Sequence, residues 1–153
     1  MLISSCNSGN ETCHPSSSEL KMVIESYENH EGYDKKKFPL GLFTREYYQA
    51  ESEFAQELLQ HFDCIQLDNL SETERISAEL LKFVLQDKID YYTFERFLNP
   101  LLSDAGFHSS LNYRVRPLSD YESTKKYLNL LNALPVFVDQ HFVNLREGLK
   151  KGV

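Results

Sequence analysis

The stretch Thr44-Arg-Glu-Tyr-Tyr-Gln-Ala-Glu-Ser-Glu-Phe-Ala-Gln-Glu-Leu-Leu-Gln-His-Phe62 carries the clearest helical pattern of the sequence. Its apolar residues recur every three or four positions, which places them on one side of an α-helix. Thr44 precedes the run and belongs to the residue types that cap helix N-termini. The pattern predicts an amphipathic helix that buries Tyr47, Tyr48, Phe54, Ala55, Leu58, Leu59 and Phe62 and turns Glu51, Glu53, Gln56, Glu57 and Gln60 largely to solvent.

Similar periodicity on both sides of this stretch predicts an all-α domain of about five amphipathic helices in an irregular bundle. Ser18 is the predicted cap of a first helix. A third helix begins with the capping box Ser71 to Glu74 and runs towards Phe97, and a fourth begins with the same device at 119–122. The predicted buried faces of the first and third helices are Leu20, Val23, Ile24 and Tyr27, and Ile76, Leu80, Phe83, Val84 and Tyr91.

Pro135 divides the last apolar pattern of the sequence. Because proline lacks a backbone N–H and clashes with the preceding turn, Pro135 either kinks the fourth helix or lies in the first turn of a fifth, and we expect a break with a sharp change of direction. The predicted buried faces of these two helices are Tyr121, Leu128, Leu131 and Leu134, and Val138, Phe142, Leu145 and Leu149.

The length, composition and charge of the chain limit the classes of protein to which it can belong. With 153 residues, of which 41% are hydrophobic and 25% charged, the chain is long enough for a core that needs no metal or disulfide. A formal net charge of −7 works against nucleic acid as a partner, because affinity for phosphates depends mainly on Lys and Arg. The basic run Lys35-Lys36-Lys37 is too short to reverse this charge and is predicted to be a solvated turn.

The sequence begins with Leu2-Ile3-Ser4-Ser5-Cys6, which resembles a bacterial lipobox. This motif predicts lipidation of Cys6, a polar tether up to residue 18 and a helical domain over 19–153. The basic segment and apolar run of a signal peptide do not precede the motif, so an exposed thiol at Cys6 is the alternative. No apolar run approaches ~18 residues, and we therefore expect membrane contact only through a lipid anchor. With Asn7 after the cysteine, the expected location is the cell envelope, on the periplasmic side of the outer membrane.

Cys13 and Cys64 remain as a pair if Cys6 is acylated. An oxidising compartment would allow them to form a disulfide, which would stabilise the fold by roughly 4 kcal/mol in the chain-entropy view. The alternative is that both thiols are free.

Residues 99–117 form a long segment without helical periodicity, and such segments in compact domains are often functional. The candidate substrate-facing residues in this segment are Gly106, His108, Tyr113 and Arg114. With Arg116, these side chains predict contact with an anionic group such as a peptide carboxylate. The alternative is a loop that packs on the helices through Leu101, Leu102, Phe107 and Leu111.

The sequence contains no recognised catalytic motif. His61 and Cys64 have the spacing of two zinc ligands on a helix, but no second pair accompanies them. The acidic residues Glu51, Glu53 and Glu57 lie on a predicted solvent face. We therefore assign no catalytic and no metal-ligating residue to this chain.

Several segments together resemble the N-terminal part of the bacterial family called domain of unknown function 885. They are Leu70-Ser-Glu-Thr-Glu-Arg-Ile-Ser-Ala-Glu-Leu-Leu-Lys-Phe-Val-Leu, Gly106-x-His108, Arg116-Pro-Leu-Ser-Asp-Tyr-Glu, Leu131-Asn-Ala-Leu-Pro-Val-Phe-Val-Asp-Gln and Asn144-Leu-Arg-Glu-Gly-Leu-Lys-Lys-Gly. The resemblance covers about Leu42 to Val153. Ala105-Gly106 departs from the two adjacent glycines that many relatives show.

The resemblance implies a largely helical protein of several hundred residues, often a lipoprotein, with a later zinc-peptidase-like His-Glu and Gly-His-His region. Those zinc ligands are not in this chain. The chain would be the non-catalytic N-terminal portion of an exported, metal-dependent hydrolase acting on peptides, with the remainder of its polypeptide as partner. The alternative is a stand-alone helical binding or structural module tethered at the envelope.

The hydrolase hypothesis also predicts an incomplete domain. In that case the apolar faces of the last two predicted helices are under-covered in this chain, because the polypeptide that would cover them is absent. We therefore expect an exposed apolar patch and self-association of the chain.

Overall fold

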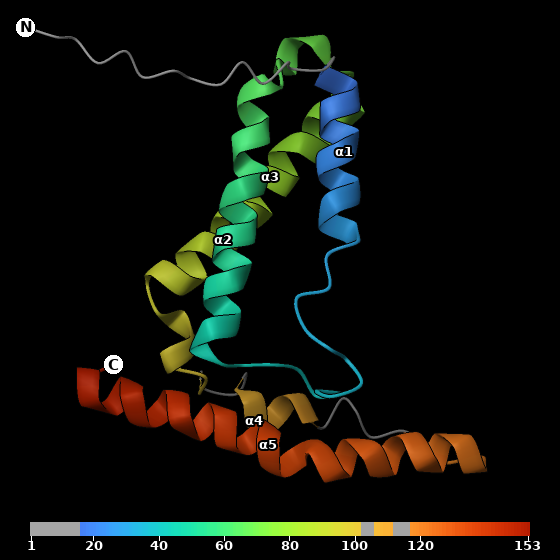
Figure 1. The fold of residues 1–153 in the computed structure, drawn as a ribbon, viewed down its shortest axis with the longest axis vertical. Helices are drawn as coiled ribbons and strands as arrows, with labels where there is room; N and C mark the ends of the chain where they lie inside the picture. Colours follow the sequence, from blue (N-terminus) through green and yellow to red (C-terminus); the bar gives the residue numbers. More distant parts are fainter. Residues whose placement is uncertain (1–15, 102–105, 112–116) are drawn as a thin grey trace, which may run out of the picture.

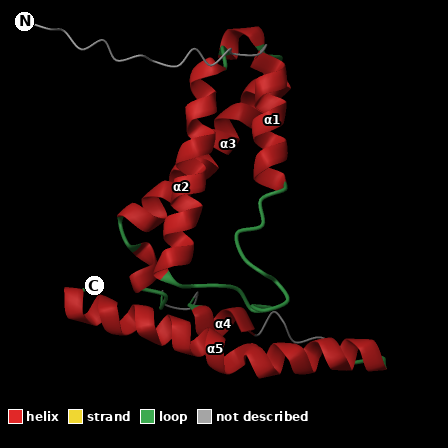
Figure 2. Ribbon diagram, viewed as in Figure 1, coloured by secondary structure: helices red, strands yellow, loops and turns green. Residues whose placement is uncertain are grey.

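The computed structural model describes residues 16–101, 106–111 and 117–153 (Figure 1). Within these ranges the chain is helical without any strand, which confirms the predicted all-α class (Figure 2). The α-helices are α1 (Ser16–Glu28), α2 (Arg45–His61), α3 (Glu72–Thr93), α4 (Phe107–Ser110) and α5 (Tyr121–Lys151). Three 3-10 turns, η1 (Phe62–Cys64), η2 (Leu67–Asn69) and η3 (Arg96–Leu98), connect them.

Helices α1, α2 and α3 run up and down beside one another and form a three-helix bundle, and α5 lies across one end of this bundle (Figure 1). The bundle encloses the main apolar core, to which α1 contributes Leu20 and Val23 and α2 contributes Ala55, Leu58 and the following Phe62. Ile24, Tyr27, Phe54 and Leu59 pack against its edge. These positions confirm the predicted buried faces of the first two helices.

The predicted buried face of α3 is wrong for its first three residues, while Val84 and Tyr91 are partly buried. Ile76, Leu80 and Phe83 are 57%, 61% and 71% exposed, and the buried residues of α3 are Ala78, Leu81 and Leu85. Ala55 of α2 and Ala78 of α3 are both almost fully buried. Small side chains on both helices allow a close approach, so burying the side with the alanine gives tight packing.

Two predicted helix starts are confirmed by their hydrogen bonds. The Thr44 hydroxyl accepts from the Tyr47 N–H at 3.3 Å. Ser71 and Glu74 form the predicted capping box of α3. The Ser17 hydroxyl of α1 also donates to Glu74. The start of α3 is thereby joined to the start of α1.

Two other predicted starts are shifted along the chain. Helix α1 begins at Ser16 rather than after a cap at Ser18. Helix α5 is capped by Asp120 rather than by Ser119, and its partner in the capping box is Ser123. The shift arises because the Asp120 carboxylate accepts from the Ser123 N–H at 2.7 Å. A carboxylate at this position also interacts favourably with the helix dipole.

The third helix ends earlier than predicted, at Thr93 instead of near Phe97. Glu95 has φ 49° and ψ 34°, a left-handed conformation that no α-helix continues through. Its carboxylate is held by Arg45 of α2 at 2.9 Å and by Lys151 of α5 at 2.7 Å. This network turns the chain towards α5 at the point where the two parts of the fold meet.

The predicted break at Pro135 is also wrong, because α5 is a single helix of 31 residues. It bends near its middle without changing direction sharply (Figure 1). Pro135 is exposed. The carbonyl that loses its helical hydrogen bond at a proline can therefore be hydrated, which lowers the cost of continuing the helix.

Glu51 is a buried residue rather than the solvated one predicted, with 7% of its surface exposed. Its carboxylate lies 2.7 Å from His30 Nε2 and also accepts a hydrogen bond from Lys88 of α3. Burial raises the pKa of Glu51, but the hydrogen bonds from Lys88 and His30 outweigh it and the pKa is lowered. Glu51, His30 and Lys88 therefore form a hydrogen-bonded cluster that links the helices of the bundle, and each of the three groups has a polar partner.

We expect Glu51→Gln to lower the free energy of unfolding at neutral pH by about 1.5 kcal/mol, since charge-assisted hydrogen bonds are replaced by neutral ones. The pKa of Glu51 is lowered below its ordinary 4.5, so this advantage of the parent shrinks as the pH falls below that value. Urea unfolding at several pH values measures the effect. Glu57→Gln on the exposed side of α2 is the matched control, and an equal loss in both variants contradicts the assignment.

Candidate functional site

Helix α5 buries a side that is mostly polar or small, formed by Phe137, His141, Asn144 and Gly148. Phe137 packs edge-on against Phe43, with ring centroids 5.3 Å apart. Asn144 donates to the Phe43 carbonyl at 2.8 Å. The segment before α2 is thereby fixed to the middle of α5 by both apolar and polar contacts.

Gly148 marks the closest approach of α5 to the rest of the fold. A Cβ atom at this position would lie 2.6 Å from the carbonyl oxygen of Leu98 and 3.4 Å from its Cβ. Leu98 is almost fully buried in η3. Glycine is therefore required for contact between the backbones of α5 and η3.

His141 lies among aromatic rings on this buried side. Its ring stacks on Phe107 of α4 with centroids 4.4 Å apart, and Phe43 and Phe137 are within 4.4 and 4.7 Å. The residue is 5% exposed, and neither ring nitrogen has a hydrogen-bond partner among the described residues. Burial lowers the pKa of His141 from 6.5 to about 4. The imidazole is therefore neutral at pH 7 and fills an aromatic pocket.

The aliphatic side of α5 is uncovered. Leu128, Leu131, Phe142 and Leu149 are 52%, 40%, 44% and 75% exposed. The predicted burial of Tyr121, Leu128 and Leu131, and of Phe142 and Leu149, is therefore wrong, because α5 buries the side with Phe137, His141, Asn144 and Gly148 instead. The expectation of an exposed apolar patch on this part of the chain is confirmed.

The apolar residues of α5 that lie off its buried side follow the spacing of a helix-pairing surface; most of them are exposed, and Val138 and Leu145 are half-buried. Apolar residues stand at intervals of three and four, which puts them in one line along the helix. We call this line the α5 stripe; it consists of Leu128, Leu131, Pro135, Val138, Phe142, Leu145 and Leu149. A stripe of this kind lies against one partner helix in known helix pairs.

The structure places two of the candidate loop residues and leaves the other two outside its described ranges. Gly106 precedes α4 and His108 lies within it, and Phe107 between them stacks on His141. Tyr113 and Arg114 fall in a segment that the structure does not describe. A substrate-facing role of Gly106 and His108 stays a prediction, beside the packing role that Phe107 supports.

The cysteine predictions fall mainly outside the described ranges. Cys64 is disulfide-bonded, and both Cys6 and Cys13 lie in the undescribed segment before Ser16. Ser16 lies next to η2, since its hydroxyl accepts from the Gln66 N–H at 2.9 Å. Lipidation of Cys6 and pairing of Cys13 with Cys64 stay predictions.

No group of three or more potential metal-ligating side chains occurs among the described residues. In this part of the chain, no helix is both long and apolar enough to cross a membrane.

Comparison of the chain with protein-family models, with curated proteins and with solved structures finds no match. The α5 stripe is the candidate site that the geometry supports best, because its apolar residues share one side of the helix and most of them are exposed. Helical periodicity alone does not identify this surface as exposed, because periodicity marks apolar residues without showing what covers them.

Proposed function

We propose that this chain is a non-catalytic helical portion of an exported, metal-dependent hydrolase, and that α5 docks on a helix of the remaining polypeptide. The observation that carries the proposal is the α5 stripe. Its residues are apolar and mostly exposed, whereas the side that α5 buries includes His141 and Asn144. Contiguous exposed apolar surfaces often mark interaction sites in soluble proteins.

The resemblance to the domain of unknown function 885 family supports the same proposal. Its two strongest segments, around Leu134-Pro135 and Leu145-Arg-Glu-Gly148, both lie on α5. The first carries part of the stripe, and the second ends at the glycine that packs on Leu98. In this proposal zinc and the catalytic groups belong to the remaining polypeptide, which acts on peptides.

Export of the chain is supported by the disulfide at Cys64, because disulfides persist in oxidising compartments. We propose attachment at the cell envelope through a lipid on Cys6. Metabolic labelling with a radioactive fatty acid tests this step. Label that disappears in Cys6→Ser supports the anchor, and an unlabelled parent protein removes it from the proposal.

We expect the chain by itself to self-associate through the α5 stripe. The double substitution Leu131→Lys with Leu149→Lys should make it monomeric while leaving its thermal unfolding nearly unchanged, since both side chains are exposed. Sedimentation velocity at high micromolar concentration measures the association. Leu80→Lys on the exposed side of α3 is the matched control and should leave the association intact.

Two results would contradict this proposal. One is a parent protein that is monomeric at the same concentration and melts sharply. The other is loss of association in the Leu80→Lys variant. Sequencing the gene beyond the codon of Val153 tests the hydrolase assignment separately: a reading frame leading to His-Glu and Gly-His-His motifs supports it, and a stop codon favours the tethered helical module.

A further inference from the structure

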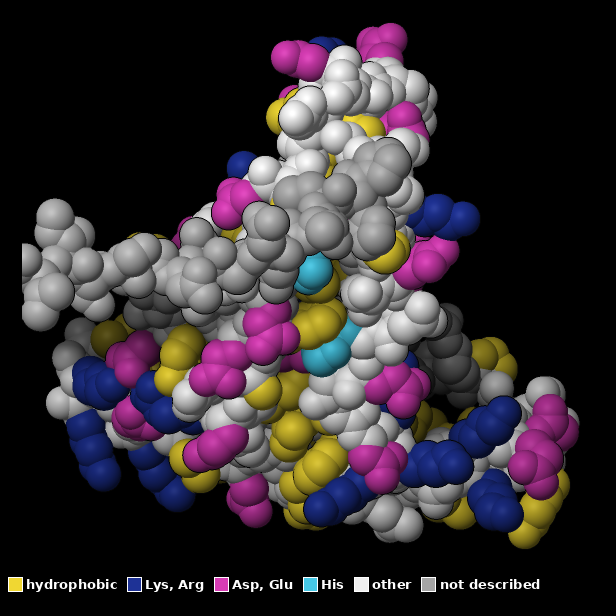
Figure 3. Space-filling view, turned by 45° about the horizontal axis from the view of Figure 1, so that its top comes forward, with side chains coloured by type: hydrophobic (Ala, Val, Ile, Leu, Met, Phe, Trp, Pro, Cys, Tyr) yellow, Lys and Arg dark blue, Asp and Glu magenta, His cyan; other side chains and the backbone are white. Residues whose placement is uncertain are grey.

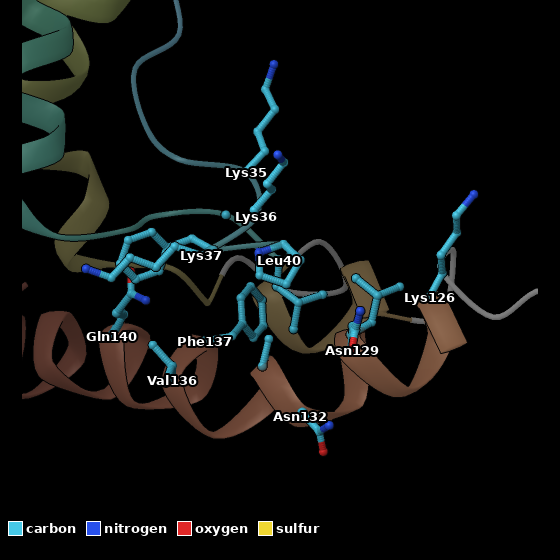
Figure 4. Close-up of a pocket in the computed structure, with 15 residues that line it drawn as sticks. Lys35, Lys36, Lys37, Leu40, Lys126, Asn129, Asn132, Val136, Phe137 and Gln140 are labelled. Carbon is cyan, nitrogen blue, oxygen red and sulfur yellow. The ribbon is translucent and has the colours of Figure 1, made fainter. Parts of the chain in front are cut away.

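A pocket of about 670 Å³ lies between the loop at 35–41 and the N-terminal half of α5 (Figure 4). Its volume is in the range of pockets that bind small organic molecules. It opens on the side of α5 that faces the loop, away from the α5 stripe. The pocket is therefore a feature distinct from the docking surface.

The loop that forms one wall has a defined conformation. The Asp34 carboxylate accepts from the backbone N–H groups of Lys36 and Lys37 at 2.8 and 3.2 Å. These hydrogen bonds also lower the pKa of Asp34. Gly41 closes the loop with φ +111°, and a Cβ there would lie 2.5 Å from the ring of Phe43. The lysine run is therefore presented by a structured turn.

The floor of the pocket is apolar. Leu40 and Phe137 are both 3% exposed, and their side chains lie next to each other at the centre of the pocket (Figure 4). Ala133 and Val136 of α5 extend this floor. The small side chain of Ala133 leaves room above the helix, so an apolar group of a ligand can be buried there.

The mouth of the pocket is cationic. Four lysines line it, and no carboxylate occurs among its described lining residues. This is unusual for a chain with a net charge of −7. Lys35, Lys36 and Lys126 extend in the same direction, away from the apolar floor (Figure 4). Lys and Arg side chains are frequent at the α5 end of the molecule, with Asp and Glu side chains among them (Figure 3).

Amide groups add hydrogen-bond donors beside the lysines. The Gln140 carbonyl accepts from the Phe43 N–H at 2.5 Å, which leaves its NH₂ group as a donor at the edge of the pocket. Asn129 lies beside the floor (Figure 4). An acidic group at the mouth would find both positive charge and neutral donors.

We propose that this pocket binds a small amphiphilic anion, with its phosphate or carboxylate at the mouth that the four lysines line and its apolar part on Leu40, Ala133 and Phe137. The separation of an apolar floor from a cationic mouth is the feature that selects an amphiphile over a simple ion. The same chemistry is offered by a free alkyl phosphate and by the headgroup region of an anionic bilayer, and a probe kept below its micelle concentration distinguishes the two.

Octyl phosphate, kept below its micelle concentration, is the probe for calorimetric titration of the 153-residue protein. We expect it to bind more tightly than inorganic phosphate and octyl glucoside, and more weakly at high salt. The double substitution Lys36→Gln with Lys126→Gln should raise the Kd by about tenfold, which is the loss of two modest ion pairs. Lys82→Gln on the exposed side of α3 is the matched control and should leave the Kd unchanged.

A second variant tests the floor independently of charge. Ala133→Leu places a larger side chain in the pocket and should weaken octyl phosphate binding while leaving the lysines in place. The proposal is overturned if octyl glucoside binds as well as octyl phosphate, or if the double lysine variant binds with the parent affinity. It is also overturned if the protein sediments with anionic phospholipid vesicles but does not bind monomeric octyl phosphate.

Discussion

Gly148→Val should lower the free energy of unfolding by about 3 kcal/mol and detach the C-terminal half of α5 from the fold. The reason is steric: a Cβ at this position meets the Leu98 carbonyl oxygen at 2.6 Å, and a backbone atom of buried η3 cannot yield as a flexible side chain would. Thermal unfolding gives the change in stability, and amide hydrogen exchange along α5 shows where protection is lost.

Lys150→Val is the matched control for this substitution. It introduces the same β-branched residue into the same turn of α5, but at an exposed position. We expect a change within about 0.5 kcal/mol and unchanged protection of α5. Equal losses in the two variants would attribute the effect to helix propensity and contradict the close contact with Leu98.

The pattern of the sequence indicated where α1, α2 and α3 lie, but not the short α4, the continuity of α5 or the choice of buried side. Helix α3 carries one apolar row at Ile76, Leu80 and Phe83 and another at Ala78, Leu81 and Leu85. Both rows have helical spacing, and the larger side chains favoured the first. The structure buries the second, since α2 presents Ala55 and close packing of two helices depends on a partner that periodicity does not identify.

Glu51 is a polar residue whose burial the sequence pattern also did not predict. Its place among charged neighbours in α2 predicted a solvated side chain, yet it is buried against His30 and Lys88. These partners are 21 and 37 residues away in the sequence. Nothing local to Glu51 indicated them, because an ion pair between helices depends on how the helices are arranged in space.

The candidate site was partly predictable. The sequence indicated uncovered apolar residues in the last third of the chain, and the α5 stripe has this character. The continuity of the stripe was not predicted, because Pro135 was expected to end one helix and begin another. Pro135 is exposed because α5 buries the side with Phe137, His141, Asn144 and Gly148. Water can reach the carbonyl that loses its hydrogen bond at an exposed proline, so the helix continues at a lower cost than it would at a buried one.

The histidine on that buried side should make the protein sensitive to acid. Burial lowers the pKa of His141 to about 4, compared with 6.5 for an ordinary histidine. Between these values the unfolded chain binds a proton that the folded chain does not, so stability falls as the pH falls. We expect a loss of roughly 3 kcal/mol from this group between pH 6.5 and pH 4. Urea unfolding across this range measures the loss as a difference from the variant His141→Leu.

His141→Leu should be more stable than the parent at neutral pH by about 1 to 3 kcal/mol, because two buried nitrogens without partners are replaced by carbon of similar volume. Its advantage should increase as the pH falls to 4, since the leucine takes up no proton. Asn144→Ala, one turn further along the same side of α5, is the control: it removes the hydrogen bond to Phe43, and its cost should be the same at every pH. A parallel pH profile for all three proteins would show that the His141 ring is hydrated or hydrogen-bonded in solution.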